Sequence, residues 1–221
     1  MDPVVIDNPE TARTPDGFLA FYRDPYDASS CGLSANTNCA VGAALYHCSG
    51  KLLWVHNFKN FLSKPTHLEV QDVRYDRGLL YFNEACQSYS KEAGGQCSAL
   101  VAVDPKEKKV LWRSKPLISN NRFMVLKNYI IAGYGFTAEP DFLYVIRKSD
   151  GSVAQKISIP TSHEELKLEG DRLVVSIYGD KLLHYRMEGF DGDKPKLVKL
   201  ADPPPPARQP QGLGTRQLHG F

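Results

Sequence analysis

Three polar side chains are the best placed for ligand chemistry: His67, Asn121 and His163. Each lies in a polar segment at the entry to a predicted inner strand. If the three inner strands are equivalent strands of a repeated sheet, the three side chains ring one opening. They would then contact a small ligand or a partner there. The alternative is that each imidazole or amide bonds to nearby backbone groups of the loops.

No catalytic constellation accompanies these residues. His67 and His163 lack a defined third ligand, so the sequence does not predict a metal site. A Ser-His-Asp spacing, a Gly-rich phosphate loop and an H-E-x-x-H motif are all missing from the sequence. We therefore predict no catalytic residue and no cofactor, and a non-enzymatic protein is favoured over an enzyme.

The five cysteines suggest two disulfides. Cys31 and Cys39 flank one short polar stretch, Cys86 and Cys97 flank another, and Cys48 is left over. Local pairing predicts two bridges, each stabilising the fold by roughly 2–3 kcal/mol through the entropy of the unfolded chain. Cross-pairing between the two stretches and five free thiols in a reducing cytosol are the alternatives.

The sequence is consistent with two cellular compartments. Residues 1–10 are acidic and lack the basic start and apolar core of an export signal. Either the protein is cytoplasmic, or the sequence begins after a removed signal and the protein is periplasmic or secreted. Disulfides would favour the second reading.

Composition supports neither nucleic-acid binding nor a membrane span. The 221 residues carry 27 Lys and Arg against 25 Asp and Glu, with no long basic run, so nucleic-acid binding is not predicted. No stretch reaches the roughly 18 consecutive apolar residues that a membrane span requires.

Short apolar runs recur along the chain instead of helical patterns. A turn followed by a strand-like run occurs at residues 16–22, 76–82, 127–134 and 170–178, and a hairpin follows each copy. A four-stranded unit of about 40–55 residues, repeated four times, predicts an all-β fold made of β-propeller blades. The alternative is a β-sandwich of short strands.

The predicted blades divide residues 1–200. Their boundaries fall at residues 1–62, 63–118, 119–160 and 161–200. Residues 201–221 contain a proline run and are predicted to form a flexible tail.

Two of the units resemble the PQQ-like propeller repeat. Residues 102–112 contain Ala, Asp and a polar turn before Trp112, and residues 49–54 repeat the turn and end at Trp54. We predict that both tryptophans are packing anchors. The resemblance implies blades like those of quinone dehydrogenases and of the outer-membrane assembly lipoprotein. Quinone dehydrogenases of this type often carry two adjacent cysteines, which this sequence lacks, so a quinone is not predicted.

Members of that family usually have seven or eight blades, and this chain has room for four. The resemblance therefore implies either a four-bladed ring or half of a larger ring. In the second case a homodimer would complete the propeller and cover the open strand edges.

Long connections on one face suggest a binding surface. They span residues 24–43, 83–98 and 135–141, and carry Tyr26, Tyr89 and Phe136 among small polar residues. Aromatic side chains on loops held by a rigid scaffold are typical of binding sites. We therefore predict an interaction scaffold that binds a protein or peptide partner there. The alternative is a ligand- or metal-binding sensor, or an enzyme, centred on His67 and His163.

Overall fold

The computed structural model describes residues 3–4, 13–14, 16–22, 42–63, 68–86, 89–91, 93–136 and 139–201. Nearly all regular structure in these ranges is antiparallel strand, with one short 3-10 helix at Phe58–Asn60. The predicted Cys31–Cys39 bridge, His67, Tyr26 and the tail beyond residue 201 lie outside the described residues. The all-β prediction is confirmed.

The strands form four sheets. The first contains β1 (Pro3–Val4), β2 (Arg13–Thr14), β3 (Gly17–Tyr22), β4 (Gly42–Tyr46) and β5 (Leu52–Asn57). The second contains β6 (Leu68–Asp76), β7 (Leu79–Cys86), β8 (Ala99–Asp104) and β9 (Lys109–Arg113). The third contains β10 (Asn120–Val125), β11 (Tyr129–Tyr134), β12 (Phe142–Arg147) and β13 (Val153–Ser158). The fourth contains β14 (His163–Glu169), β15 (Arg172–Ile177), β16 (Lys181–Glu188) and β17 (Lys196–Lys199).

Consecutive strands pair within each sheet, so every sheet is an up-and-down blade. Strand β2 is the exception, because it pairs with β3 beside the main path of the first sheet. A sandwich would instead spread the strands over two large facing sheets. The β-propeller prediction therefore holds, and the sandwich alternative is wrong.

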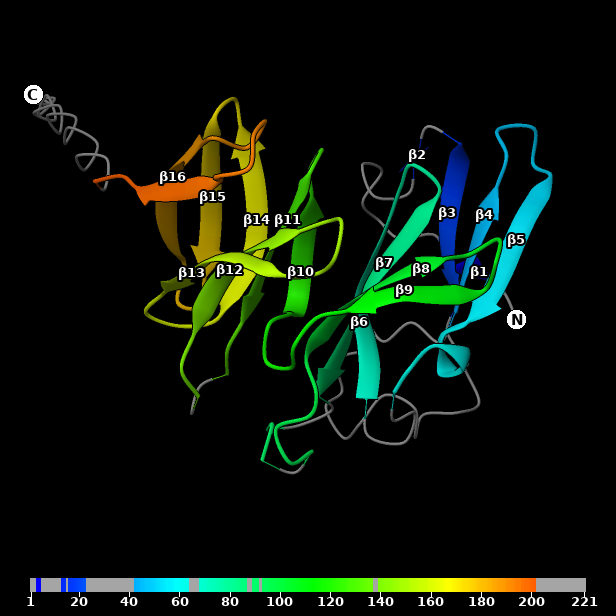
Figure 1. Ribbon diagram of the computed structural model, residues 1–221, viewed down its shortest axis with the longest axis horizontal. Coiled ribbons are helices and arrows are strands. Elements are labelled where there is room, and N and C mark those ends of the chain that lie inside the picture. Colours follow the sequence, from blue (N-terminus) through cyan, green and yellow to red (C-terminus); the bar gives the residue numbers. More distant parts are fainter. Residues whose placement is uncertain are drawn as a thin grey trace, which may run out of the picture.

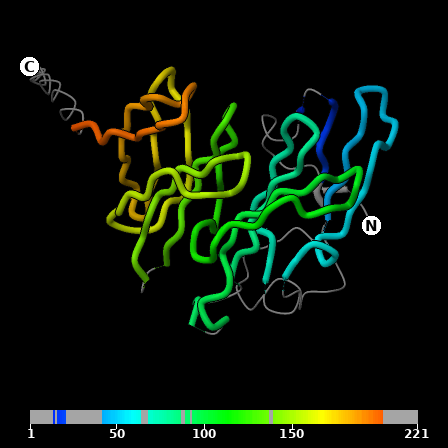
Figure 2. Tube along the Cα trace, viewed as in Figure 1, coloured from blue at the N-terminus to red at the C-terminus, as the bar shows by residue number. Residues whose placement is uncertain are grey.

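The four sheets are arranged as an open arc. The first and fourth sheets lie at opposite ends of the molecule, with the second and third between them (Figure 1). The chain passes from sheet to sheet in sequence order, from its blue end to its red end (Figure 2). Strands β6, β10 and β14 lead the second, third and fourth sheets, and β10 contacts both β6 and β14 along the inside of the arc. The described residues therefore do not form a closed four-bladed ring.

Apolar side chains fill the spaces between neighbouring sheets. Between the second and third, Tyr81 and Leu100 meet Phe123 and Ile130. Because the second sheet has a neighbour on both sides, β7 and β8 are buried along nearly their whole length. The outermost strand β9 instead alternates between half-buried and exposed positions.

Trp112 joins the second sheet to the third, as predicted for a packing anchor. Its indole Nε1–H donates to the carbonyl of Lys148, at 2.9 Å, just beyond the end of β12. The ring lies against Gly151, where an added Cβ would be 2.5 Å from Trp112 Cε3. Gly151 also has a φ of 72°, a conformation that costs an L-residue roughly 1–2 kcal/mol. Glycine is thus required there both for space and for backbone conformation.

We expect Gly151→Ala to lower the free energy of unfolding by roughly 2–3 kcal/mol, because a steric clash adds to the backbone cost. Gly170→Ala is the matched control. Gly170 has a φ of 64° with no atom within 4 Å of its added Cβ, so only the backbone cost of about 1 kcal/mol applies. Urea denaturation of both variants measures the difference, and equal losses would contradict the docking role of Gly151.

Candidate functional site

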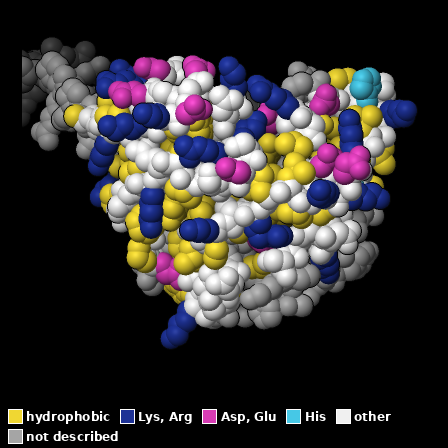
Figure 3. Space-filling view, in the orientation of Figure 1, with side chains coloured by type: hydrophobic (Ala, Val, Ile, Leu, Met, Phe, Trp, Pro, Cys, Tyr) yellow, Lys and Arg dark blue, Asp and Glu magenta, His cyan; other side chains and the backbone are white. Residues whose placement is uncertain are grey.

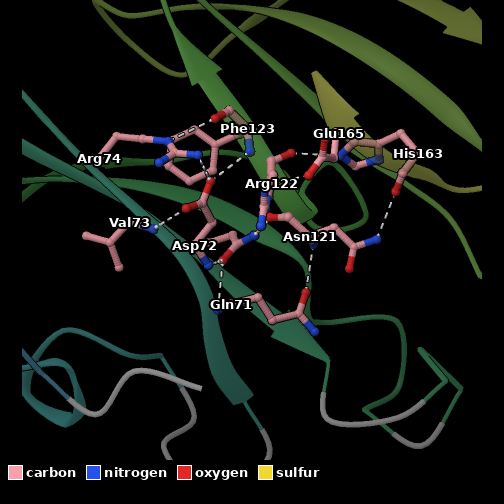
Figure 4. A network of polar contacts seen from close by, with 10 residues as sticks. Gln71, Asp72, Val73, Arg74, Asn121, Arg122, Phe123, His163 and Glu165 are labelled. Carbon is pink, nitrogen blue, oxygen red and sulfur yellow. Dashed lines mark hydrogen bonds and ion pairs between the residues drawn. The ribbon is translucent and has the colours of Figure 1, made fainter. Parts of the chain in front are cut away.

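The predicted site residues Asn121 and His163 lie where the inner strands bulge. The register shifts after Asn120 in β10 and after His163 in β14, and it shifts after Val70 in β6. A bulge leaves backbone groups without ladder partners. The three bulges meet along the inside of the arc, where polar side chains satisfy those groups (Figure 4).

Asn121 links three sheets. Its backbone N–H donates to Gln71 Oε1 of the second sheet at 2.7 Å, and its Nδ2 donates to the carbonyl of His163 in the fourth sheet at 3.1 Å. Asn121 has a φ of 55°, a left-handed conformation that Asn adopts more readily than most residues. Its amide is therefore engaged with the backbone of a neighbouring blade.

His163 is fully buried beside the third sheet. Its Nε2–H donates to the carbonyl of Arg122 at 2.7 Å. The imidazole packs so closely on Gly133 that any side chain there would clash with its Nδ1. Nδ1 has no hydrogen-bond partner among the described residues. Burial lowers the pKa of His163, so the ring is neutral at pH 7.

Asp72 is the carboxylate of the same network, and its side chain is only 11% exposed. Its Oδ1 accepts from the backbone N–H of Val73 at 3.0 Å, and its Oδ2 accepts from that of Phe123 at 2.9 Å. Arg74 Nη2 lies 2.9 Å from Oδ2. Burial nevertheless raises the pKa of Asp72 to about 6, because the loss of water outweighs the opposing charge of Arg74.

Asn83 of β7 completes the network and was not singled out by the sequence. Its Oδ1 accepts from the backbone N–H groups of Gln71 and Asp72, at 3.0 and 2.9 Å. Its Nδ2 donates to the carbonyl of Asn121 at 2.7 Å. Asn83 therefore holds the β6 bulge and ties it to the third sheet.

The polar side chains of this network bind backbone groups of their own and of neighbouring blades. No group of three His, Cys, Asp or Glu side chains suited to a metal ion occurs in the part of the chain that the structure describes. Beside the network, Arg122 and Glu165 form an ion pair at 2.7 Å, and both side chains are more than half exposed. In the described residues, the network's chemistry is thus hydrogen bonding between strands.

The predicted aromatic loops form a second candidate surface, at the lower edge in Figure 1. The Tyr89 and Phe136 rings lie 6.0 Å apart, although they come from the connections of different sheets. Ser90 donates to Glu139 Oε1 through its backbone N–H at 3.0 Å and its hydroxyl at 2.8 Å. Tyr134 donates to the other oxygen of Glu139. Aromatic and charge-assisted contacts therefore join the two connections.

A disulfide closes the first of these connections. Cys86 and Cys97 are bonded, with their Cα atoms 5.1 Å apart, as local pairing predicts. Cys48 is free and exposed, also as predicted. The bridge holds the two ends of the loop that carries Tyr89.

Charges of both signs are distributed over the surface. Lys and Arg side chains are interspersed with Asp and Glu on the face shown in Figure 3. Within the described ranges, no helix has the length and apolar character needed to cross a membrane.

The buried imidazole predicts a pH effect on stability. Folding lowers the pKa of His163 below its ordinary 6.5. The stability that the neutral imidazole contributes is therefore complete above that pH and is lost on acidification. We expect the wild-type free energy of unfolding to fall relative to His163→Gln as the pH drops from 7 to 5, by at most about 1.4 kcal/mol per pH unit. Gln is chosen because its amide can still donate to the Arg122 carbonyl.

The comparison with His163→Gln is needed because Asp72 acts in the opposite direction. Its pKa rises on folding from 3.8 to about 6, so stability falls as the pH increases through that interval. Both proteins retain Asp72, and its contribution cancels in the difference between their denaturation curves. Parallel pH profiles for the two proteins would contradict the buried neutral imidazole.

Comparison with known proteins shows no family for this chain. No family model matches the chain, and no curated protein matches it. Similar solved structures include BamB from Moraxella catarrhalis, with 9% identity over 84% of this chain and 63% of that one, at a TM-score of 0.48. The β-propeller domain of Cps50 (Swd1) from Myceliophteria thermophila shares 12% identity over 72% of this chain and 52% of its own, at 0.49. The computationally designed Ika4 protein has 11% identity over 67% of this chain and 82% of its own, at a TM-score of 0.45.

The chain spans about half of the Cps50 domain and less than two thirds of BamB. Membership of the PQQ-like family stays a prediction, because no family model matches.

Proposed function

We propose that this protein is a non-enzymatic β-propeller scaffold that binds a protein or peptide partner through its loop-rich face. The observation that carries the proposal is the contact between the connections of the second and third sheets. Tyr89 and Phe136 pack together there, and Glu139 binds Ser90 across the same junction. Two adjoining blades thus contribute to one surface.

This surface suits a binding role because it is held in place before a partner arrives. The disulfide closes one connection and hydrogen bonds fix the other, so less conformational entropy is lost on binding. Tyr89 is 46% exposed and offers a rigid aromatic contact area. Most of the connection at residues 24–43, including Tyr26, lies outside the described residues, and it is included in the proposal on sequence grounds.

The test is a selection of binding peptides from a display library on the immobilised wild-type protein. We expect most selected peptides to bind Tyr89→Ser/Phe136→Ser at least tenfold more weakly. Leu111→Ser is the control, because Leu111 is 45% exposed on β9, away from the connections. Thermal melts verify that both variants fold. Undiminished binding to the double variant would refute the proposal.

A ligand or metal sensor, or an enzyme, at His67 and His163 is the alternative function. We rank it second because the His163 Nε2 and the Asn121 amide are both engaged with backbone carbonyls. Loss of binding of a metal or small ligand in His67→Ala/His163→Gln, with peptide capture retained, would favour this alternative.

A second copy completing the ring is a separate proposal. In the fourth sheet, the side turned away from the third carries the exposed pairs Lys167–Glu169 and Arg186–Glu188. Burying these charges in a dimer would be costly unless the second copy paired them. The mass measured by light scattering decides between a monomer and a dimer.

We also propose an oxidising compartment, on the strength of the Cys86–Cys97 bond. Non-reducing mass spectrometry of the natural protein tests it. A linked peptide pair containing Cys86 and Cys97 is expected, and free thiols at both positions would refute it.

A further inference from the structure

A pocket of about 980 Å³ lies between the first and second sheets. It is at the end of the sheets opposite the loop-rich face, where the β4–β5 and β6–β7 turns lie at the upper edge in Figure 1. Its walls include Trp54 of β5 and Tyr75 of β6, and its rim includes Arg77, Lys106 and Lys108. The proposed scaffold function makes no use of it.

The pocket exists because Trp54 does not dock as Trp112 does. Trp112 donates its indole N–H to the carbonyl of Lys148, the first residue after β12. The first residue after β8 is Pro105, and its carbonyl instead accepts from His56 Nε2 at 2.6 Å. The acceptor that Trp54 would use is therefore taken by the histidine two residues further along its own strand.

A difference in the turns also keeps the Trp54 indole away from the β8–β9 turn. Gly151, on which Trp112 rests, has a φ of 72° in the β12–β13 turn. Lys108 has a φ of 53° at the equivalent place in the β8–β9 turn. A lysine there presents a side chain where the third sheet presents a bare backbone. The space that Trp112 fills at one junction is consequently left open at the other.

The pocket therefore combines an indole N–H that lacks a partner with positively charged side chains. Trp54 is nine-tenths buried, and its Nε1–H has no hydrogen-bond partner among the residues described. Lys106 and Lys108 form no ion pair within the described part of the chain, and Arg77 lies 3.9 Å from Asp76. The acidic residue in the lining is Asp16, which hydrogen-bonds Tyr75. Positive charge thus prevails at the rim.

We propose that this pocket binds a small organic anion with an apolar or aromatic body. The body packs against the rings of Trp54 and Tyr75, whose centroids lie 5.8 Å apart across the two sheets. The anionic group lies between Lys106 and Lys108, which supply donors for a carboxylate, phosphate or sulfonate. A pocket with apolar walls and a few charged groups at its rim is the usual form of a small-molecule site.

A pair of fluorescent probes separates the anionic requirement from simple hydrophobic binding. The sulfonate 8-anilinonaphthalene-1-sulfonate is expected to bind, and N-phenyl-1-naphthylamine, which lacks the sulfonate, is expected to bind at least tenfold more weakly. Lys106→Ala/Lys108→Ala should weaken sulfonate binding at least tenfold. Lys194→Ala/Lys196→Ala, which removes the same charge from the exposed surface of the fourth sheet, should leave it unchanged.

Equal affinity for the two probes, or equal affinity in the two lysine variants, would overturn the proposal. The indole N–H signals provide an independent measurement, because the chain has two tryptophans. In ¹⁵N-labelled protein, with the signals assigned through Trp54→Phe, titration of the sulfonate should shift the Trp54 signal and leave that of Trp112 in place. A shift of Trp112 instead, or no shift of either, would likewise overturn it.

Discussion

Replacing Asn83 with leucine will lower the free energy of unfolding by about 3–5 kcal/mol. Asn83 is completely buried, and its amide binds the backbone N–H groups of Gln71 and Asp72 and the carbonyl of Asn121. Leucine has a similar volume but no polar atoms, so three backbone groups lose their partners inside the protein. Each unsatisfied backbone group lowers the stability by about 1–3 kcal/mol, and local relaxation recovers part of this loss.

Urea denaturation of Asn83→Leu and of Asn128→Leu measures this effect against a matched control. Asn128 is exposed in the β10–β11 turn, so the same change there should alter stability by no more than about 0.5 kcal/mol. A loss below about 1 kcal/mol for Asn83→Leu would mean that water or backbone movement satisfies the three groups. The network would then not be what ties β6 to the third sheet.

The blades could be predicted from the sequence because their signals are local. A strand such as Leu79–Cys86 is bounded by a turn and rich in apolar residues, and these features recur within each unit. The Cys86–Cys97 bridge was equally accessible, since it closes a loop between consecutive strands. Pairing between neighbours in the chain leaves few alternatives.

The polar network could not be predicted in the same way. Asn83 and Asn121 are separated by 38 residues, and their contact depends on how two blades are oriented. Asp72 lies within a strand whose pattern shows no bulge in advance, so the inward position of its carboxylate had no sequence signal. Curvature of the arc is likewise a sum of small angles between sheets. His163 and Asn121 were singled out in the sequence only because each lies at or next to the first residue of a strand.

The docking difference between Trp54 and Trp112 is an intermediate case. Lys108 replaces the glycine of the later repeat, and this is visible when the turns at residues 105–109 and 148–152 are aligned. The consequence for the pocket also requires His56 to take the carbonyl of Pro105, which is a tertiary contact. A departure from an internal repeat therefore indicates a candidate site, and the tertiary contacts explain why a pocket forms there.

Glu84→Ala will lower the free energy of unfolding by about 3–4 kcal/mol, because it removes one partner of a buried, two-point ion pair. Glu84 is 1% exposed, and its two oxygens lie 2.7 and 2.9 Å from Arg113 Nη2 and Nε. They also accept from the N–H and hydroxyl of Ser63, and Arg113 in turn donates to the carbonyl of Phe61. The carboxylate therefore joins β7 and β9 to the segment that arrives from the first sheet.

Glu165→Ala is the control for this prediction, since its ion pair with Arg122 is equally short but exposed. Because solvent screens that pair, its loss should cost less than about 1 kcal/mol. A double-mutant cycle with Arg113→Ala separates the pairwise energy from the other bonds of Glu84. If Glu84→Ala costs no more than Glu165→Ala in denaturant titrations, the second sheet does not depend on this carboxylate. A large loss with strong coupling to Arg113 would identify the pair as the main polar connection between the first two blades.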